Sequence, residues 1–235
     1  MSLATNLAVI QYRIREACKR AGRSPESVLL LAVSKTHPPQ AVEEAVVGGQ
    51  IFFGESKVQE AKQKIPLCPG AARWHFIGHL QSNKVRDAAI LFEMIESVDS
   101  PALAREISKR CQQAARTMPI LLQVNVAGES SKFGCSPERL PDYVTQIATL
   151  PAIEIHGLMT LPPYAPDPEK SRRYFRRLRE LKGRCEEIIG APLAHLSMGM
   201  SDDFEIAIEE GATIVRVGTA LFGRRIRSSP PAPEN

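Results

Sequence analysis

Eight short apolar runs alternate with helix-like stretches along most of this 235-residue chain. The runs are Val28–Val33, Ile51–Phe53, Trp74–Ile77, Leu91–Val98, Ile120–Val126, Ile153–Leu161, His195–Met198 and Thr213–Val217. Near-continuous apolar strands separated by helices are typical of a parallel sheet that is covered on both faces. Eight such units close into a (β/α)8 barrel of roughly 250 residues. The alternation therefore predicts an α/β fold with a single TIM barrel.

The intervening stretches contain helical periodicity. An amphipathic helix precedes the first run, with apolar positions at Leu3, Leu7, Ile10, Ile14, Ala17 and Ala21 and a stop at Gly22. Further helices are expected at Pro39–Val47, Ala102–Ala115, Leu140–Leu150 and Glu169–Ile189. The last of these has an apolar face of Phe175, Leu178, Leu181, Cys185 and Ile188.

A doubly wound open sheet is the alternative architecture. It predicts fewer strands and a glycine-rich first turn, whereas the turn here is Ser34-Lys35-Thr36-His37-Pro38. No internal repeat or mid-chain linker is evident, so residues 1–226 are expected to form one barrel domain. The proline-rich residues 227–235 are expected to be a disordered tail.

Composition narrows the function classes only partly. The net charge of +4 suits a small anionic ligand as well as nucleic acid. Five scattered cysteines without a Cys-x-x-Cys pair favour reduced thiols over disulfides or structural zinc. Arg13 and Arg15 interrupt the first apolar stretch, and no apolar segment approaches 18 residues. We therefore expect a cytoplasmic protein without a signal peptide or membrane span.

In a TIM barrel, functional side chains lie at the carboxyl ends of the strands. Lys35 follows the first run and, by strand alternation, shares a face with Leu31 and Val33. If that face points into the barrel, desolvation lowers the lysine pKa, and a neutral amine attacks carbonyl groups. If Lys35 lies beyond the strand, it is an ordinary solvated lysine.

The last two strand ends are suited to an anion. Phosphate groups often bind between the loops after strands 7 and 8 of such barrels, and here those ends are Ser197-Met198-Gly199 and Gly218-Thr219. Arg216 shares a face with Ile214 and Gly218 and needs a partner or a ligand if buried. Ordinary turns and a structural salt bridge are the alternatives. Together with Lys35, these features fit a phosphorylated aldehyde held as an imine.

Other candidates are weaker. His75 and His79 are four residues apart, but no further ligand cluster accompanies them, so no metal site is expected. Six arginines between Arg172 and Arg184 lie on a helix with a clean apolar face, which favours a solvated basic face over a nucleic-acid site. Lys132 follows the fifth strand and is either a second amine near the barrel mouth or a flexible loop residue.

Seven short segments, in order, resemble the pyridoxal 5′-phosphate (PLP) homeostasis proteins. They are Ala32-Val33-Ser34-Lys35-Thr36, Phe53-Gly54-Glu55, Trp74-His75-Phe76-Ile77-Gly78, Gln81-Ser82-Asn83-Lys84, Gly157-Leu158-Met159-Thr160, Leu196-Ser197-Met198-Gly199-Met200-Ser201-Asp202 and Arg216-Val217-Gly218-Thr219. The resemblance extends over nearly the whole chain and implies a barrel of the alanine racemase N-terminal type.

The resemblance also implies a cofactor site. In this site, Lys35 binds PLP as a Schiff base and Arg216 faces the pyridine nitrogen. The phosphate is held by Ser197, Gly218 and Thr219 with nearby backbone. Met159 and Met198 are expected to be further cofactor contacts. Ser56 stands where the family usually has Asn, which leaves one ring contact in doubt. No catalytic residue is assigned.

The function implied is a PLP carrier or regulator in vitamin B6 homeostasis and amino-acid balance, rather than an enzyme. An arginine at the ring nitrogen weakens PLP as an electron sink, and no second domain for a racemase is expected after the eighth strand. Free amino acids and PLP-dependent apoenzymes are the expected partners, nucleic acid and membranes are not, and a monomer is expected. A PLP-dependent racemase or decarboxylase is the main alternative. A cofactor-free Schiff-base lyase for sugar phosphates and a nucleic-acid binder remain the others.

Overall fold

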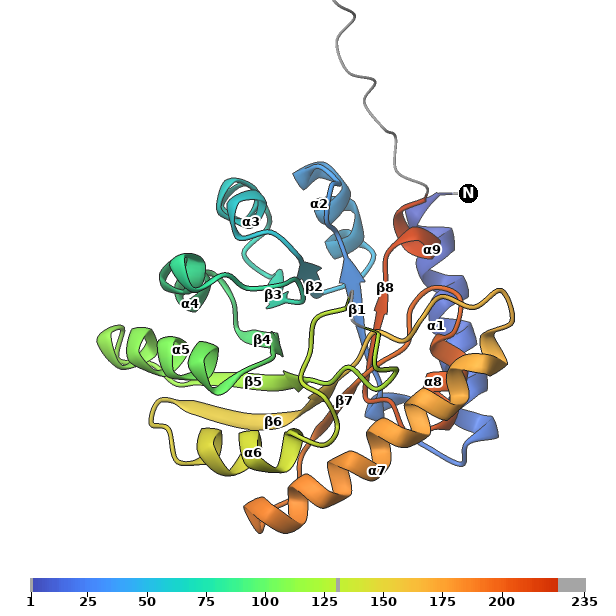
Figure 1. Ribbon diagram of the computed structural model, residues 1–235. Helices are drawn as coiled ribbons and strands as arrows, with labels where there is room; N and C mark the ends of the chain where they lie inside the picture. The colour runs from blue at the N-terminus through green and yellow to red at the C-terminus, as the bar shows by residue number, and fades with distance from the viewer. Residues whose placement is uncertain (1, 130–131, 224–235) are drawn as a thin grey trace, which may run out of the picture.

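The computed structural model describes residues 2–129 and 132–223, and within them eight parallel strands close into one barrel in chain order (Figure 1). The strands are β1 (Leu29–Val33), β2 (Phe52–Glu55), β3 (Arg73–Phe76), β4 (Met94–Val98), β5 (Met118–Gln123), β6 (Ile153–Met159), β7 (His195–Ser197) and β8 (Ile214–Val217). The predicted TIM barrel is confirmed, and the open-sheet alternative is wrong because β1 pairs with β8 as well as with β2.

Helices surround the barrel and follow the strands. They are α1 (Leu3–Arg20), α2 (Pro39–Val47), α3 (Val58–Lys64), α4 (Val85–Leu91), α5 (Pro101–Gln113), α6 (Leu140–Ala148), α7 (Arg172–Ile189), α8 (Phe204–Glu209) and α9 (Thr219–Phe222). Helix α1 lies beside α8 and α9 (Figure 1), and Asn6 donates from its side-chain amide to the Leu221 carbonyl at 2.9 Å. The predicted N-terminal helix therefore covers the β8 side of the barrel.

Local sequence accounts for the helix ends. Ser2 begins α1 by accepting a hydrogen bond from the Thr5 amide, and Ser100 does the same for α5 with Leu103. Pro101 occupies the first turn of α5, where a missing N–H costs nothing. Helix α7 is capped by Gly190, whose φ of +72° is the left-handed conformation that glycine adopts without strain.

Several predicted boundaries are wrong by a few residues. The run expected to begin a strand at Leu91 instead ends α4 at that residue, and β4 starts at Met94. Strand β2 extends to Glu55, so that the Glu55 side chain belongs to the barrel itself. On α7, Phe175, Leu178, Leu181 and Cys185 are buried as predicted, whereas Ile188 is 42% exposed. The tail expected at 227–235 lies outside the described residues.

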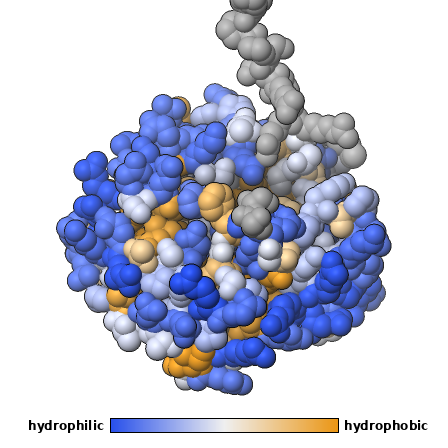
Figure 2. Space-filling model, in the orientation of Figure 1, coloured by the Kyte–Doolittle hydropathy of each residue, from blue (hydrophilic) through white to orange (hydrophobic). Residues whose placement is uncertain are grey.

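The apolar core is divided by the barrel wall. A large cluster lies between the strands and the helices, and a smaller one fills the barrel interior with Leu31, Met94, Leu121, Met159 and Ile214. Leu31 pairs with Arg216 across β1 and β8, so the inward face of β8 carries an arginine next to this apolar interior. The face seen in Figure 2 is largely hydrophilic, with smaller hydrophobic areas near its middle and at its lower edge.

Three of the six arginines of α7 form ion pairs with glutamates at the end of α8. Arg172, Arg176 and Arg179 pair with Glu210 at 3.1–3.2 Å, and Arg172 also reaches Glu169 and Glu209. The pairs with Glu209 and Glu210 join α7 to the carboxyl end of α8. Part of the helical charge is therefore used to attach one helix to the next.

Two glycines provide a test of the packing. A Cβ at Gly157 in β6 would lie 1.9 Å from the His195 carbonyl oxygen, whereas one at Gly183 in α7 meets nothing within 4 Å. We expect Gly157→Ala to lower the free energy of unfolding by about 3 kcal/mol or more, as overpacking does. Gly183→Ala should raise it by up to about 1 kcal/mol through helix propensity. Thermal and urea unfolding of both variants measure this, and equal effects would contradict the packing of β6 on β7.

Candidate functional site

A cavity of about 230 Å³ opens where the strands end. Its lining is drawn from β1, β3, β6, β7 and β8 and the segments that follow them. The lining residues are Val33, Lys35, His37, Ile77, Leu161, Met200, Ser201, Asp202, Arg216, Gly218, Thr219 and Gly223. Four predicted site residues, Lys35, Arg216, Gly218 and Thr219, are thus brought together.

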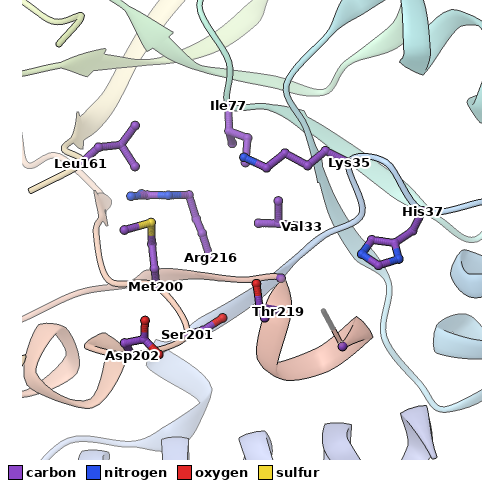
Figure 3. Close-up of a pocket in the computed structure, with 12 residues that line it drawn as sticks. Val33, Lys35, His37, Ile77, Leu161, Met200, Ser201, Asp202, Arg216 and Thr219 are labelled. Atoms are coloured by element: carbon purple, nitrogen blue, oxygen red, sulfur yellow. The ribbon is translucent and has the colours of Figure 1, made fainter. Parts of the chain in front are cut away.

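Lys35 enters the cavity from the end of β1. Its side chain extends past Val33 toward Ile77, and the amine lies with the Arg216 guanidinium in the upper half of the close-up (Figure 3). Lys35 is half-buried. It is therefore neither the fully desolvated lysine nor the fully solvated lysine that the sequence left as alternatives. Since Ile77 also packs on the barrel-interior cluster, the amine lies close to apolar surface.

Arg216 is held rigidly inside the barrel. Only 3% of the residue is exposed, its Nη1 donates to Ser197 Oγ at 2.6 Å, and its Nη2 donates to the Thr160 carbonyl at 2.7 Å. Burial lowers the pKa of Arg216, and the charge of Glu96 opposes that effect. The guanidinium therefore borders the cavity in a fixed orientation.

A buried carboxylate balances this arginine. Glu96 accepts from Ser197 Oγ at 2.5 Å and shares a 2.7 Å hydrogen bond with His75 Nδ1. Burial alone would raise the pKa of Glu96, but the His75 hydrogen bond and charge, together with the charge of Arg216, bring it below its ordinary value. Because an arginine cannot accept and a carboxylate cannot donate, the Ser197 hydroxyl must accept from Arg216 and donate to Glu96.

The loops after β7 and β8 supply hydroxyl groups. In Figure 3 the side chains of Ser201 and Thr219 lie together in the lower half of the view. Ser201 Oγ accepts from the Ala220 amide at 3.3 Å, which joins the loop after β7 to α9. Gly199 permits the turn before Ser201, because its φ is +91° and a Cβ there would lie 2.6 Å from Ala207 Cβ.

The remaining predicted residues lie elsewhere. Ser197 is fully buried between Glu96 and Arg216, Met159 belongs to the barrel-interior cluster, and Met198 packs in the outer cluster. Ser56 is half-buried just after β2, and its carbonyl oxygen would be 2.0 Å from a Cβ at Gly78. In the described part of the chain, none of these four is among the lining residues.

Several lining residues were not predicted, most notably Ser201. It lies in the same quoted segment as Ser197, four residues further on. Ser197 is still in β7 and faces inward, whereas Ser201 follows the strand in the loop. A signal was available, since phosphate-binding groups in barrels come from the loops rather than from the strands themselves.

The weaker candidates also have defined surroundings. His79 stacks on Phe133 with ring centroids 3.8 Å apart, and Lys132 Nζ lies 3.4 Å from the carbonyl oxygen of Leu161, a lining residue. Among residues 2–129 and 132–223, no group of three or more His, Cys, Asp or Glu side chains could hold a metal ion. No helix in that same range is sufficiently long and apolar to cross a membrane.

Comparison with solved structures supports the fold. The PipY protein of Synechococcus elongatus, solved with PLP bound, is 36% identical with a TM-score of 0.82, covering 94% of this chain and all of that one. PipY without PLP is 37% identical with a TM-score of 0.85, over 94% of this chain and 100% of that one. An alanine racemase from Corynebacterium glutamicum shares the fold. It is 18% identical with a TM-score of 0.69, covering 95% of this chain and 64% of that one.

Sequence comparison identifies the family. The pyridoxal phosphate homeostasis protein of Aquifex aeolicus is 45% identical over 226 residues, 96% of this chain and 99% of that protein. The protein of the same name from Pseudomonas aeruginosa is 46% identical over 230 residues, 97% of this chain and 98% of its own. The family described as "Alanine racemase, N-terminal domain" matches residues 5–225. The chain thus belongs to the alanine racemase N-terminal domain family and, within it, to the pyridoxal phosphate homeostasis proteins.

Proposed function

We propose that this protein binds PLP at the barrel mouth and serves PLP homeostasis. The observation that carries the proposal is the lining of one cavity by an amine, a guanidinium and two hydroxyls, from Lys35, Arg216, Ser201 and Thr219. A structural relative at 36% identity was solved with PLP bound, which supports the same ligand here.

The donor set fits the chemical groups of PLP. The Lys35 amine would join the aldehyde carbon as a Schiff base, with loss of one water. The Ser201 and Thr219 hydroxyls, with the Gly218 main chain, would hold the phosphate. Arg216 would face the pyridine nitrogen, and because a guanidinium keeps its proton, it would not protonate that nitrogen. Bound PLP supplies electron-withdrawing chemistry, which an unprotonated ring provides less well.

The positions of the two serines support a phosphate contact different from the predicted one. We propose that Ser201, rather than the Ser197 side chain, binds the phosphate, and that Ser197 acts by orienting Arg216. Met159, Met198 and Ser56 stay predictions. Since the side chain of Met198 packs outside the barrel wall, a contact from this residue would involve its main chain.

A carrier or regulatory role accounts better for these features than amino-acid racemisation or decarboxylation. The support is the identity of 45% to a homeostasis protein, against 18% to a racemase that shares the fold. We further propose a cytoplasmic monomer that exchanges PLP with apoenzymes and admits free amino acids to the site. All five cysteines are unpaired, which suits a reducing compartment.

Lys35→Ala should abolish the visible absorbance of the Schiff base and the borohydride-dependent label on the peptide containing residue 35. Weaker PLP binding through the phosphate contacts should remain, because Ser201 and Thr219 are untouched. Absorbance spectra, peptide mapping and calorimetry with PLP test this. A label that persists at another lysine, or a wild-type protein without PLP absorbance, would refute the proposed site.

Ser201→Ala should weaken binding of PLP and of inorganic phosphate by about tenfold, the value of one hydrogen bond to a charged group. Ser197→Ala is the matched control. It should leave phosphate affinity within about twofold and lower the melting temperature instead, because Glu96 and Arg216 lose their link. Calorimetric titration and thermal unfolding separate the two serines, and the reverse pattern would return the phosphate role to Ser197.

A further inference from the structure

A buried polar cluster lies against the main chain of the Lys35 segment. It consists of Ser34, Glu55, Glu60 and Lys64, which we call the Lys64 cluster. Lys64 Nζ donates to the Ser34 carbonyl at 2.9 Å, to Glu55 Oε1 at 2.8 Å and to Glu60 Oε1 at 2.7 Å. Ser34 Oγ also donates to Glu55 Oε1 at 2.7 Å. The cluster thus links β1, β2 and α3.

Every proton of the Lys64 ammonium has an acceptor in this arrangement, since an ammonium carries three. Lys64 is only 6% exposed and Glu55 is fully buried, so neither charge is compensated by bulk water. Burial raises the pKa of Glu55, against the effect of Lys64 and Ser34. Burial would also raise the pKa of Glu60, but its hydrogen bonds to Lys64 and to the Thr36 amide bring it below the ordinary value.

The cluster anchors both peptide groups that bound Lys35. The Ser34 carbonyl, which accepts from Lys64, belongs to the peptide group before Lys35. The Thr36 amide, which donates to Glu60 Oε1 at 2.5 Å, belongs to the peptide group after it. Since these two planes meet at the Lys35 Cα, fixing both fixes the direction of the Cα–Cβ bond.

The backbone after Lys35 needs such support. Thr36 has a φ of +67°, which is unfavourable for a β-branched residue. Residues in such conformations persist where the surroundings impose them, and they cluster at functional sites. The Glu60 side chain on α3 is only 24% exposed and accepts a hydrogen bond from the Thr36 amide.

We propose that Glu60 and Lys64 are positioning residues that aim the Lys35 side chain into the cavity. The inference rests on the proposed function, because the orientation of the Lys35 amine affects binding only if that amine reacts with an aldehyde. Neither residue lines that cavity; both instead border a shallower depression outside it, with Thr36 and His37. They act on the ligand through the Lys35 backbone, and a correctly placed amine reacts faster than one that must search.

The test compares Glu60→Ala, Glu60→Gln and Lys64→Met with the wild-type protein. The matched control is Lys62→Ala. Lys62 lies on α3 with Glu60 and Lys64, but its side chain forms a 3.0 Å ion pair with Asp87 on α4, apart from the Lys35 segment. Three quantities are measured: the rate and extent of Schiff-base formation with PLP, the affinity for pyridoxine 5′-phosphate, which has no aldehyde, and hydrogen exchange at the Thr36 amide.

Glu60→Ala and Lys64→Met should slow Schiff-base formation about tenfold and weaken PLP binding similarly, as expected for the loss of a charged hydrogen bond. Affinity for pyridoxine 5′-phosphate should stay within about twofold, and the Thr36 amide should exchange faster. Glu60→Gln should largely restore the reaction, because its amide oxygen still accepts from Thr36. Lys62→Ala should resemble wild type.

Equal losses for both ligands would overturn the proposal by showing general damage to the site, as would unchanged PLP kinetics in Glu60→Ala. If Lys64→Met does not fold, the pair Glu60→Ala and Glu60→Gln decides alone. Failure of the proposed function has a different signature: wild-type protein would then form no Schiff base with PLP, while Glu60→Ala would still release the Thr36 amide.

Discussion

The buried guanidinium of Arg216 is the constraint around which the barrel interior is arranged. A cation inside a barrel must be hydrogen-bonded and balanced, since an unpaired buried charge is prohibitively costly. Glu96 on β4 balances it through Ser197 on β7, and His75 on β3 holds the other carboxylate oxygen. These hydrogen bonds tie four strands together. They also hold the Arg216 guanidinium, which borders the cavity.

Polar groups at this end of the barrel form two layers. Those that line the cavity come from strand ends and loops, and those that hold them by hydrogen bonds lie outside the cavity lining. Ser197 stands behind Arg216, and Glu60 and Lys64 stand behind Lys35. In both cases a side chain that does not line the cavity holds a residue that does. Preorganisation of this kind lowers the entropic cost of placing a flexible lysine or arginine beside a ligand.

Periodicity predicted the fold well because each strand and helix has a simple requirement. Strand β1 must be apolar on both faces, and α2 was expected at the bounds observed, Pro39–Val47. The short helices α3, α4, α8 and α9 were not named, since four to seven residues carry too little periodicity. The start of β4 was misjudged because the apolar run from Leu91 is shared by a helix end and a strand.

The sequence by itself determined the barrel, the shared face of Ile214, Arg216 and Gly218 on β8, and the candidates Lys35, Arg216, Gly218 and Thr219. Strand alternation and position in a strand–helix unit are local properties, so they can be read from the sequence. Tertiary structure alone decided which serine lines the cavity. It also linked Glu96 to Arg216 through Ser197, and Lys64 to the Ser34 carbonyl beside Lys35. Glu96 and Arg216 are separated by 120 positions in the chain, and Lys64 and Ser34 by 30. They meet through barrel closure and strand register, and residues so far apart leave no periodic signal in the sequence.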